Sequence, residues 1–483
     1  MKEYFTLTEI QDDLHEGRLT CVQLVNHYLE RITSNAHLNA FVDVYSDEAK
    51  QRAVEIDNKL KSGSAGRLAG LVVGLKDVLS HKGHGLQAGS QILNSYVAPY
   101  NATAVQRLLD EDAIVIGRQN CDEFAMGSSN ENSSFGAVLN AADNSKVPGG
   151  SSGGSAVAVQ AGLCHASLGS DTGGSVRQPA AFCGVVGMKP SYGRVSRWGL
   201  IAYASSFDCV GPITKSVEDA ALLMEIIAGH DEFDSTVSEK AVPPYSKSAS
   251  WNGKAKIGYI RDTIESESIA PEIRQNTLEI LNRLRSLGHD VQPIEMPLLD
   301  YLLPTYYILT TAEASSNLSR FDGIRYGQRS EDATDLESLY KLSRTEGFGD
   351  EVRKRILLGT FVLSANYYDA YYTKAQRVRR LVREETERFF GQFDFLISPV
   401  APTTAFKIGE KSEDPLQMYL ADIFTVQANV VGNPAIVIPN GLDSDGMPIG
   451  IQLMAPFFEE EKMFAFAKYL SRVTRESTME VSI

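Results

Sequence analysis

Apolar and polar residues near the start of the chain alternate with a helical period. Over residues 6–35 this pattern predicts two short amphipathic helices. Each predicted helix begins with a capping box, Thr6 with Glu9 and Thr20 with Gln23. In a capping box the two side chains accept hydrogen bonds from backbone N–H groups that the helix leaves unpaired. The boxes therefore predict where both helices start.

The following segments alternate between strand and helix patterns. "NAFVDV" predicts a strand, and after it we expect a helix with Ser46 as its cap and Gly63 at its end. "RLAGLVVGLKD" is an apolar strand that ends at Lys76. Further elements are predicted as follows: helix then strand over 103–117, a helix after Ser155 and a strand over 163–170, strand–helix–strand over 256–297, helices over 301–393, and a strand over 393–400. Strands that alternate with helices favour an α/β architecture around a largely buried sheet.

The composition is ordinary for a large globular protein, with 43% hydrophobic and 22% charged residues among 483. The most polar stretch, 328–353, is expected to form a mobile loop. No run reaches the roughly 18 consecutive apolar residues of a membrane span. The N-terminus lacks the apolar segment of a signal peptide. We therefore expect a cytoplasmic protein.

The formal net charge of −15 argues against a primary nucleic-acid surface, since such surfaces are basic. It leaves open a partner that holds the nucleic acid. The cysteines are scattered, odd in number and without a CxxC pair, and they predict buried thiols in a reducing compartment: Cys21, Cys121, Cys164, Cys183 and Cys209.

Glycine is concentrated in one part of the chain. Fourteen of the 39 glycines lie within 127–199, where an even spread would place about six. Two Gly/Ser turns lie there, "VPGGSSGGSAVAVQAG" (147–162) and "GSDTGGSVRQPAAFCG" (169–184). Such density is typical of a flexible linker, but a linker does not recur as a second turn bracketed by strands. We therefore expect the turns to belong to an active site.

Three kinds of chemistry use glycine-rich turns. A phosphate-binding loop needs a Lys after its last Gly, and neither turn supplies one. A nucleophile elbow, G-x-S-x-G, is matched around Ser151, but that fold needs a catalytic His downstream. The chain has eight His and none beyond His289; His165, His230 and His289 are expected in structural positions. The elbow is therefore the weaker interpretation.

The third chemistry needs no histidine. A lysine whose pKa is lowered by burial can activate a serine hydroxyl, and backbone N–H groups of a glycine turn can form the oxyanion hole. Lys76 is placed for this role, because it ends a strand that should lie in the core. The alternative is a lysine that leaves the strand into solvent.

Lys76 in "GLKD", Ser151 in "PGGSSGGSA" and Ser175 in "GSDTGGSVRQPA" together resemble the motifs of the amidase signature family. The resemblance implies a Ser–cis-Ser–Lys triad. Ser175 would be the nucleophile, Ser151 the bridging serine of a cis peptide, and Lys76 the base. The implied fold is α/β, a single large amidase-signature domain with a central mixed β-sheet covered by helices on both faces.

The resemblance also implies the layout of that domain. It would span 1–483, with a signature core over about 66–230 and a helical, substrate-pocket insertion over about 300–395. The implied backbone donors of the oxyanion hole are Thr172, Gly173 and Gly174.

Four other segments resemble the glutaminase subunits of tRNA-dependent amidotransferases, a branch of this family: "NCDEFAMGSSNENS" (120–133), "EASSNLSRFDGIRYG" (313–327), "SRTEGFGDEVRKRILLGTF" (343–361) and "MYLADIFTVQAN" (418–429). Those enzymes correct misacylated Glu-tRNA(Gln) or Asp-tRNA(Asn). The resemblance covers nearly the whole chain. One departure is Gln427, where the family usually has proline, and we expect it to affect a helix or turn and not the chemistry.

This closer resemblance implies a glutaminase, in which the side-chain amide of glutamine acylates Ser175, ammonia leaves, and water hydrolyses the γ-glutamyl ester. Arg355 resembles the clamp for the α-carboxylate, a task suited to a planar guanidinium, and Asp422 resembles the partner of the α-ammonium. The implied partners are amidotransferase subunits B and C in a heterotrimer, with tRNA bound through the partner and no membrane involved. ATP and magnesium are expected at the partner, and no cofactor in this chain.

Other interpretations stay open at this point. A free-standing amidase of the same family would act on another small amide, but an apolar amide would leave Arg355 and Asp422 unpaired. A scaffold protein that has lost catalysis is disfavoured by the intact motif residues. A surface ion pair is the alternative role for each of the two charged residues.

His81 and His84 are spaced HxxH in a Gly-rich loop, a spacing that raises the question of a zinc site. No carboxylate motif in the sequence completes a zinc ligand set. We therefore expect no metal in this chain.

Overall fold

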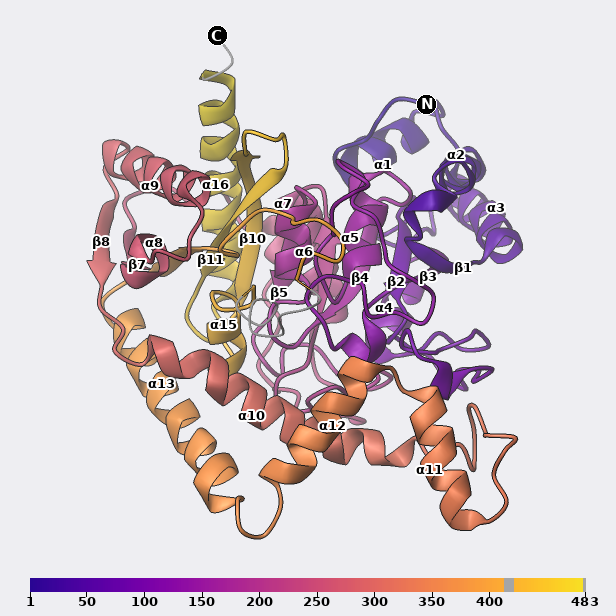
Figure 1. The fold of residues 1–483 in the computed structure, drawn as a ribbon. Coiled ribbons are helices and arrows are strands. Elements are labelled where there is room, and N and C mark those ends of the chain that lie inside the picture. Colours follow the sequence, from indigo (N-terminus) through magenta and orange to yellow (C-terminus); the bar gives the residue numbers. More distant parts are fainter. Residues whose placement is uncertain (412–420, 481–483) are drawn as a thin grey trace.

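The computed structural model describes residues 1–411 and 421–480, with side chains as far as residue 476 (Figure 1). The first three residues of the segment 418–429, which resembles the amidotransferase glutaminase subunits, lie outside the described residues. Asp422 and Gln427 lie within them.

The strands of the described chain form one 11-stranded mixed sheet. They are β1 (Phe41–Val44), β2 (Val72–Lys76), β3 (Ile114–Gln119), β4 (Ala166–Asp171), β5 (Val186–Lys189), β6 (Cys209–Thr214), β7 (Lys256–Ile260), β8 (Asp290–Ile294), β9 (Phe395–Pro399), β10 (Ala435–Leu442) and β11 (Pro448–Met454). Their order across the sheet is β1-β3-β2-β4-β6-β5-β10-β11-β9-β7-β8. The last strands of the chain therefore lie in the middle of the sheet, beside strands from its first half.

Two central strands carry the sequence motifs to one edge. β2 and β4 are buried along their whole length, as their runs of apolar and small residues predict. They pair in parallel, with Leu75 opposite Leu168. Because parallel strands point the same way, Lys76 at the end of β2 and Ser170 near the end of β4 come to the same edge.

The helices are α1 (Leu7–His15), α2 (Cys21–Ser34), α3 (Ser46–Ser62), α4 (Thr103–Asp110), α5 (Gly153–Gln160), α6 (Arg177–Phe182), α7 (Val217–Ile227), α8 (Asp262–Glu265), α9 (Pro271–Ser286), α10 (Leu299–Asn317), α11 (Leu336–Gly347), α12 (Asp350–Val362), α13 (Lys374–Phe390), α15 (Val426–Val431) and α16 (Glu460–Glu480). Helices α5 and α6 contact each other and the sheet, and α7 and α16 form a second such pair. Both pairs reach the central strands β6 and β10, so helices cover both faces of the sheet.

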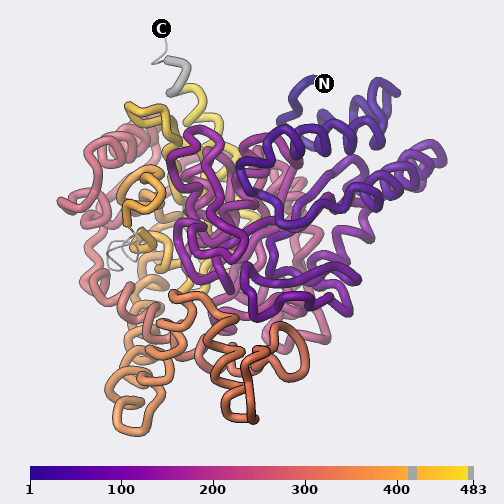
Figure 2. The backbone as a smooth tube through the Cα atoms, turned by 45° about the vertical axis from the view of Figure 1, so that its right-hand side comes forward, coloured from indigo at the N-terminus to yellow at the C-terminus, as the bar shows by residue number. Residues whose placement is uncertain are grey.

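The helices of residues 299–390 form a separate layer. In Figures 1 and 2, α10 to α13 lie below the sheet, at the opposite end from the two termini. α10 packs against both α12 and α13. The predicted α/β fold with a mixed sheet and helices on both faces is confirmed.

Local signals located most helix ends correctly. Both capping boxes are present, with Thr6 and Thr20 as the caps, and Gly63 ends α3 in a left-handed conformation, φ 69°. The expected cap Ser46 is wrong, because Ser46 is already the first residue of α3. The residue before it, Tyr45, still donates its N–H to Ile116 of β3 at 2.9 Å, so the strand pairing continues up to the helix.

The mobile loop expected over 328–353 is also wrong. Most of this stretch is helical, since α11 and the start of α12 lie in it. A capping box of Asp335 and Ser338 opens α11, and Leu339 and Ser343 are buried one turn apart. The polar residues of the stretch are the solvent face of an amphipathic helix.

Three smaller expectations were tested as well. All five cysteines are buried and unpaired, as predicted. Gln427 lies in α15 and donates its side-chain amide to Thr386 of α13 at 3.2 Å. Among the described residues, no helix has the length and apolar character needed to cross a membrane.

Candidate active site

Lys76 ends β2 inside the protein and not in solvent. Its side chain is 0% exposed. The Nζ atom lies 2.7 Å from Ser151 Oγ, 2.9 Å from Ser170 Oγ and 3.4 Å from the backbone oxygen of Ser170. The sequence predicted the first of these contacts through the family motif, and it missed Ser170.

Burial lowers the pKa of Lys76 to about 8, because desolvation disfavours the ammonium form. Nearby acidic groups, Asp122 and Asp171 among them, oppose this shift without cancelling it. A substantial part of the lysine is therefore neutral near physiological pH.

The three contacts of Lys76 suit a neutral amine. Such an amine has two N–H donors and one lone pair. The two Ser170 oxygens can accept the N–H groups, and this leaves the lone pair directed at the hydroxyl of Ser151. The arrangement can take a proton from Ser151 without any rearrangement of the lysine.

The first Gly/Ser turn is held rigidly, unlike a linker. The peptide bond between Gly150 and Ser151 is cis. The Gly150 N–H donates to Gln178 Oε1 at 2.9 Å, and a side chain at Gly150 would clash with the carboxylate of Asp122. Asp122 in turn accepts the N–H of Asn130 at 2.9 Å. The turn therefore needs glycine for close packing.

Ser175 lies in the second Gly/Ser turn, between β4 and α6, and is 7% exposed. Its backbone oxygen accepts the N–H of Ser152 at 3.1 Å. This bond joins the second turn directly to the first. The fold thus brings the two motifs together, at the edge where β2 delivers Lys76.

A buried ion pair that sequence reasoning missed supports the second turn. Asp171 and Arg177 are both 0% exposed, with Nη2 to Oδ1 and Nε to Oδ2 distances of 3.0 Å each. Burial by itself would raise the pKa of Asp171, but Arg177 lowers it to about 2. Both residues stand within "GSDTGGSVRQPA", where they are the first charges after an uncharged run that begins at residue 147. That change in charge is the signal that pointed to them.

The three expected oxyanion donors differ in their contacts. The Gly174 N–H already donates to Asp171 Oδ1 at 2.9 Å, which argues against a role for it in binding a substrate oxygen. The Gly173 carbonyl accepts the hydroxyl of Thr425 at 2.5 Å. The Thr172 hydroxyl donates to Asp208 at 2.7 Å. These bonds orient the turn, and the N–H groups of Thr172 and Gly173 remain the candidates.

Arg355 and Asp422 lie on two sides of Tyr307. The guanidinium of Arg355 is 5.4 Å from the Tyr307 ring centre, and the Tyr307 hydroxyl donates to Asp422 Oδ2 at 3.4 Å. Both charged residues are buried, Arg355 4% and Asp422 7% exposed. Arg355 also pairs with Glu351 at 2.8 Å. Because Arg355 is buried, the alternative of a surface ion pair does not describe it.

Hydrogen bonds connect this pair to the Ser175 turn. Arg355 Nη1 donates to the Tyr203 hydroxyl at 2.8 Å, and Asp208, which holds Thr172, accepts the Tyr203 N–H at 2.9 Å. On the other side, Thr425 follows Asp422 by one helical turn and binds the second turn at Gly173. Tyr203, Tyr307, Asp208 and Thr425 carried no signal in the sequence.

Desolvation raises the pKa of Asp422 to about 7, although Ser128 and Arg355 act in the opposite direction. The Ser128 hydroxyl donates to this carboxylate at 2.7 Å. Asp422 is thus a buried carboxyl group that an additional cation would stabilise in its charged form.

Two of the three histidines that a nucleophile elbow would need have structural partners. His165 Nε2 lies 2.9 Å from Asp219, which also accepts the N–H of Leu7 at 3.1 Å. His289 Nε2 lies 3.0 Å from the Tyr469 hydroxyl. The contacts of Ser151 with Lys76 favour the lysine chemistry over the elbow.

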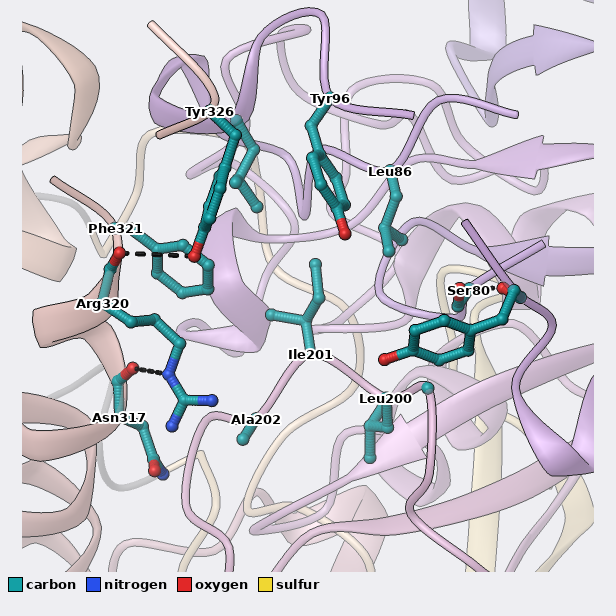
Figure 3. Close-up of a pocket in the computed structure, with 13 residues that line it drawn as sticks. Ser80, Leu86, Tyr96, Leu200, Ile201, Ala202, Asn317, Arg320, Phe321 and Tyr326 are labelled. Carbon is teal, nitrogen blue, oxygen red and sulfur yellow. Dashed lines mark hydrogen bonds between the residues drawn. The ribbon is translucent and has the colours of Figure 1, made fainter. Parts of the chain in front are cut away.

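A cavity of about 260 Å³ lies beside this network (Figure 3). Tyr96, Tyr326 and Ile201 point into it, and Asn317 is at its edge. Asn317 donates its amide to the backbone oxygen of Tyr203 at 3.2 Å. The cavity therefore adjoins the residue that holds Arg355, although no triad residue lines it.

Comparison with known proteins agrees with this geometry. A family model described as Amidase matches residues 23–464. The chain is 50% identical over 467 residues to a Chlorobium limicola protein whose name makes it the A-type component of glutamyl-tRNA(Gln) amidotransferase. The match covers 96% of this chain and 98% of that protein.

Two solved structures are similar over nearly the whole chain. The crystal structure of the corresponding A-type component of glutamyl-tRNA(Gln) amidotransferase from Thermotoga maritima is 39% identical, with a TM-score of 0.76 and 94% of each chain covered. Native peptide amidase from Stenotrophomonas maltophilia is 28% identical, with a TM-score of 0.81, covering 98% of this chain and 96% of that one. Fold, site and relatives agree, and the chain belongs to the amidase family.

Proposed function

We propose that this amidase is the glutaminase component, the A-type chain, of a tRNA-dependent amidotransferase. It would hydrolyse glutamine and supply the ammonia that converts Glu-tRNA(Gln), or Asp-tRNA(Asn), to the amidated form. The observation that carries the proposal is the buried contact of Lys76 with Ser151, beside a turn that presents Ser175. Half of the aligned residues are identical to a protein named as such a component, which supports the assignment.

The first chemical step is acylation. The Ser175 hydroxyl attacks the side-chain carbonyl carbon of glutamine and forms a C–O bond. Its proton passes to Ser151, whose own proton passes to the neutral Nζ of Lys76. N–H groups of the second turn stabilise the oxyanion. The lysine then returns a proton, through Ser151, to the leaving nitrogen; the C–N bond breaks and ammonia departs.

The second step removes the acyl group. Water attacks the γ-glutamyl ester, and the relay of Ser151 and Lys76 takes its proton. The bond to Ser175 oxygen breaks, that oxygen regains a proton, and glutamate leaves. The relay works in both directions because the pKa of Lys76 is about 8, close to the working pH.

Arg355 and Asp422 would recognise the α-carboxylate and α-ammonium of glutamine. Their opposite charges lie on two sides of one tyrosine, and hydrogen bonds tie both to the Ser175 turn. A guanidinium presents two parallel N–H groups to a carboxylate. An α-ammonium would favour the charged form of Asp422, whose pKa burial raises to about 7.

The proposed partners are amidotransferase subunits B and C, in a heterotrimer. tRNA, ATP and magnesium would bind at the partner, and this chain would use no cofactor in its chemistry. The net charge of −15 supports the division of tasks, since a polyanion such as tRNA is repelled by an acidic surface.

A free-standing amidase acting on another small amide is the second candidate, and the similarity to a peptide amidase favours it. The two are distinguished by ammonia release from glutamine and from butyramide, which lacks both α-groups. We expect Arg355→Lys to raise KM for glutamine about 100-fold, since a bidentate charged contact contributes about 3 kcal/mol. Hydrolysis of butyramide should change little.

Arg353→Lys is the matched control, because Arg353 lies on the same helix, is exposed and pairs with Asp350. It should leave both substrates unaffected. Equal loss of both activities in Arg355→Lys, or faster turnover of butyramide than of glutamine by the parent, would favour the free-standing amidase.

A further inference from the structure

Outside the active site, three possible metal ligands meet at the first turn of α3. Glu48 lies in that turn, and His81 and His84 come from the loop after β2. One ligand atom from each lies within 4.8 Å of the others, and His84 Nε2 is 2.8 Å from Glu48 Oε2. The expectation that no carboxylate completes the HxxH pair is therefore wrong, because the carboxylate comes from an earlier helix.

The loop is shaped to bring both imidazoles to one side. The His84 N–H donates to the His81 backbone oxygen at 3.1 Å and closes a turn. Gly83 in this turn has φ +84°, a left-handed conformation that favours glycine. The two rings stack with centres 4.3 Å apart and planes 13° from parallel, and the Tyr45 ring packs on His84 at 3.9 Å.

His81 has an unsatisfied group at this place. The residue is 7% exposed, and its Nδ1 atom is buried without a hydrogen-bond partner in the described part of the chain. A buried polar atom without a partner costs about 1–3 kcal/mol. A bound cation is one way to satisfy an imidazole nitrogen, since neutral imidazole is a common metal ligand.

There is room beside the cluster for further ligands. A cavity of about 220 Å³ is lined by Glu48 and His81 together with Arg52 and Glu55. The positive charge of Arg52 is already paired, with Asp112 at 2.9 Å and Glu55 at 3.3 Å. A metal ion there would therefore not face an uncompensated cation, and water could complete its coordination.

We propose that Glu48, His81 and His84 bind one divalent transition-metal ion, with Zn²⁺ as the ion that suits the set best. Two imidazoles, one carboxylate and water form a common four-coordinate zinc environment. With metal–ligand distances near 2.1 Å, closure on one ion needs side-chain shifts of about 1 Å, and the exposed Glu48 side chain can move. The ion would fasten α3 to the loop that follows Lys76 and would take no part in the hydrolysis.

Co²⁺ replaces Zn²⁺ at such sites and reports its ligands through visible absorption. The full-length chain, freed of metal by a chelator, is titrated with Co²⁺ and then with Zn²⁺. We expect one ion per chain and a melting temperature that rises with Zn²⁺. Glu48→Gln and His84→Ala should each weaken binding at least tenfold and abolish most of the thermal shift.

Asp47→Asn and His37→Ala are the matched controls, since both residues are exposed and lie outside the cluster. They should bind the metal as the parent does. Circular dichroism checks that every variant is folded. Absence of saturable binding of one ion by the parent, equal affinity in Glu48→Gln and His84→Ala, or thiolate-to-cobalt bands that place the ion on a cysteine would overturn the proposal.

Discussion

At the scale of single residues, the chemistry of this protein depends on keeping one lysine neutral. An exposed lysine is almost wholly protonated at pH 7, with a pKa of about 10.4. Burial lowers the pKa of Lys76 to about 8, which leaves about a tenth of it neutral at pH 7. Desolvation therefore makes an ordinary amine available as a base, and Ser170 holds it toward Ser151.

The first prediction concerns the pH dependence of the parent enzyme and the identity of the base. Glutaminase activity should rise with pH through about 8 and level off above it, because only neutral Lys76 accepts a proton. Lys76→Arg should lower the rate at least about 10⁴-fold, since a guanidinium stays protonated. Ammonia release from pH 6 to 10 measures both. A variant that keeps most of the parent rate would exclude Lys76 as the base.

Ser170→Ala tests whether Ser170 positions the amine. The hydroxyl stabilises the ammonium more than the amine, because hydrogen bonds to charged groups are stronger. Its loss should move the midpoint of the pH–rate profile down by about one unit and lower the plateau. A merely structural role would reduce stability and leave the midpoint in place.

The nucleophile is tested by covalent labelling. We expect an ester-forming substrate to label Ser175 and not Ser151, because Ser151 is engaged with Lys76. Ser175→Ala should lose glutaminase activity and keep its fold, since the change removes one hydroxyl. Mass spectrometry of the trapped acyl-enzyme gives the site. A label on Ser151 would restore the nucleophile elbow.

At the scale of elements, the site is an edge where strands end and tight turns begin. β2 delivers Lys76, β4 delivers Ser170 and Asp171, and the two Gly/Ser turns pack against each other there. The pair of Asp171 and Arg177 joins the end of β4 to the start of α6. The turn that carries Ser175 is thus closed at both ends by one buried ion pair.

Breaking this pair should destabilise the whole protein. Asp171→Asn leaves the Arg177 charge buried without its partner, and we expect a loss of about 3–5 kcal/mol in the free energy of unfolding. The control, Glu387→Gln, makes the same change in the exposed pair with Arg383 at 2.9 Å and should cost no more than about 0.5 kcal/mol. Urea denaturation measures both. Equal losses would show that the buried pair has no special role.

At the scale of the whole molecule, one sheet joins segments from the entire chain, and the helices of residues 299–390 add a layer at one end (Figure 2). α10 and α12 bring Tyr307 and Arg355 to the edge where the triad lies. The expected subdivision into a signature core and a helical insertion stays a prediction, and it is compatible with this placement.

The acidic surface leads to a prediction about partnership. We expect low glutaminase activity for the isolated chain and higher activity with subunits B and C, because uncontrolled hydrolysis would waste glutamine. The isolated chain should bind tRNA weakly at physiological salt, given its net charge of −15. Ammonia release with and without the partners, and a tRNA binding titration, measure this. Tight tRNA binding by the chain alone would contradict the division of tasks.

The sequence alone determined the features that depend on near neighbours. Caps at Thr6 and Thr20, the end of α3 at Gly63 and the burial of β2 follow from local hydrogen bonds and apolar runs. The motifs also identified the triad candidates, through resemblance to a family. Local signals failed at 328–353, where the outer face of an amphipathic helix resembled a polar loop.

The tertiary structure decided the contacts between groups far apart in the chain. The register of β2 and β4 sets Ser170 against Lys76, and the packing of α10 and α12 places Tyr307 beside Arg355. Glu48 reaches His84 in the same way. Such contacts depend on the packing of whole elements, and no local pattern encodes them. The burial that lowers the pKa of Lys76 likewise exists only when the surrounding layers are assembled.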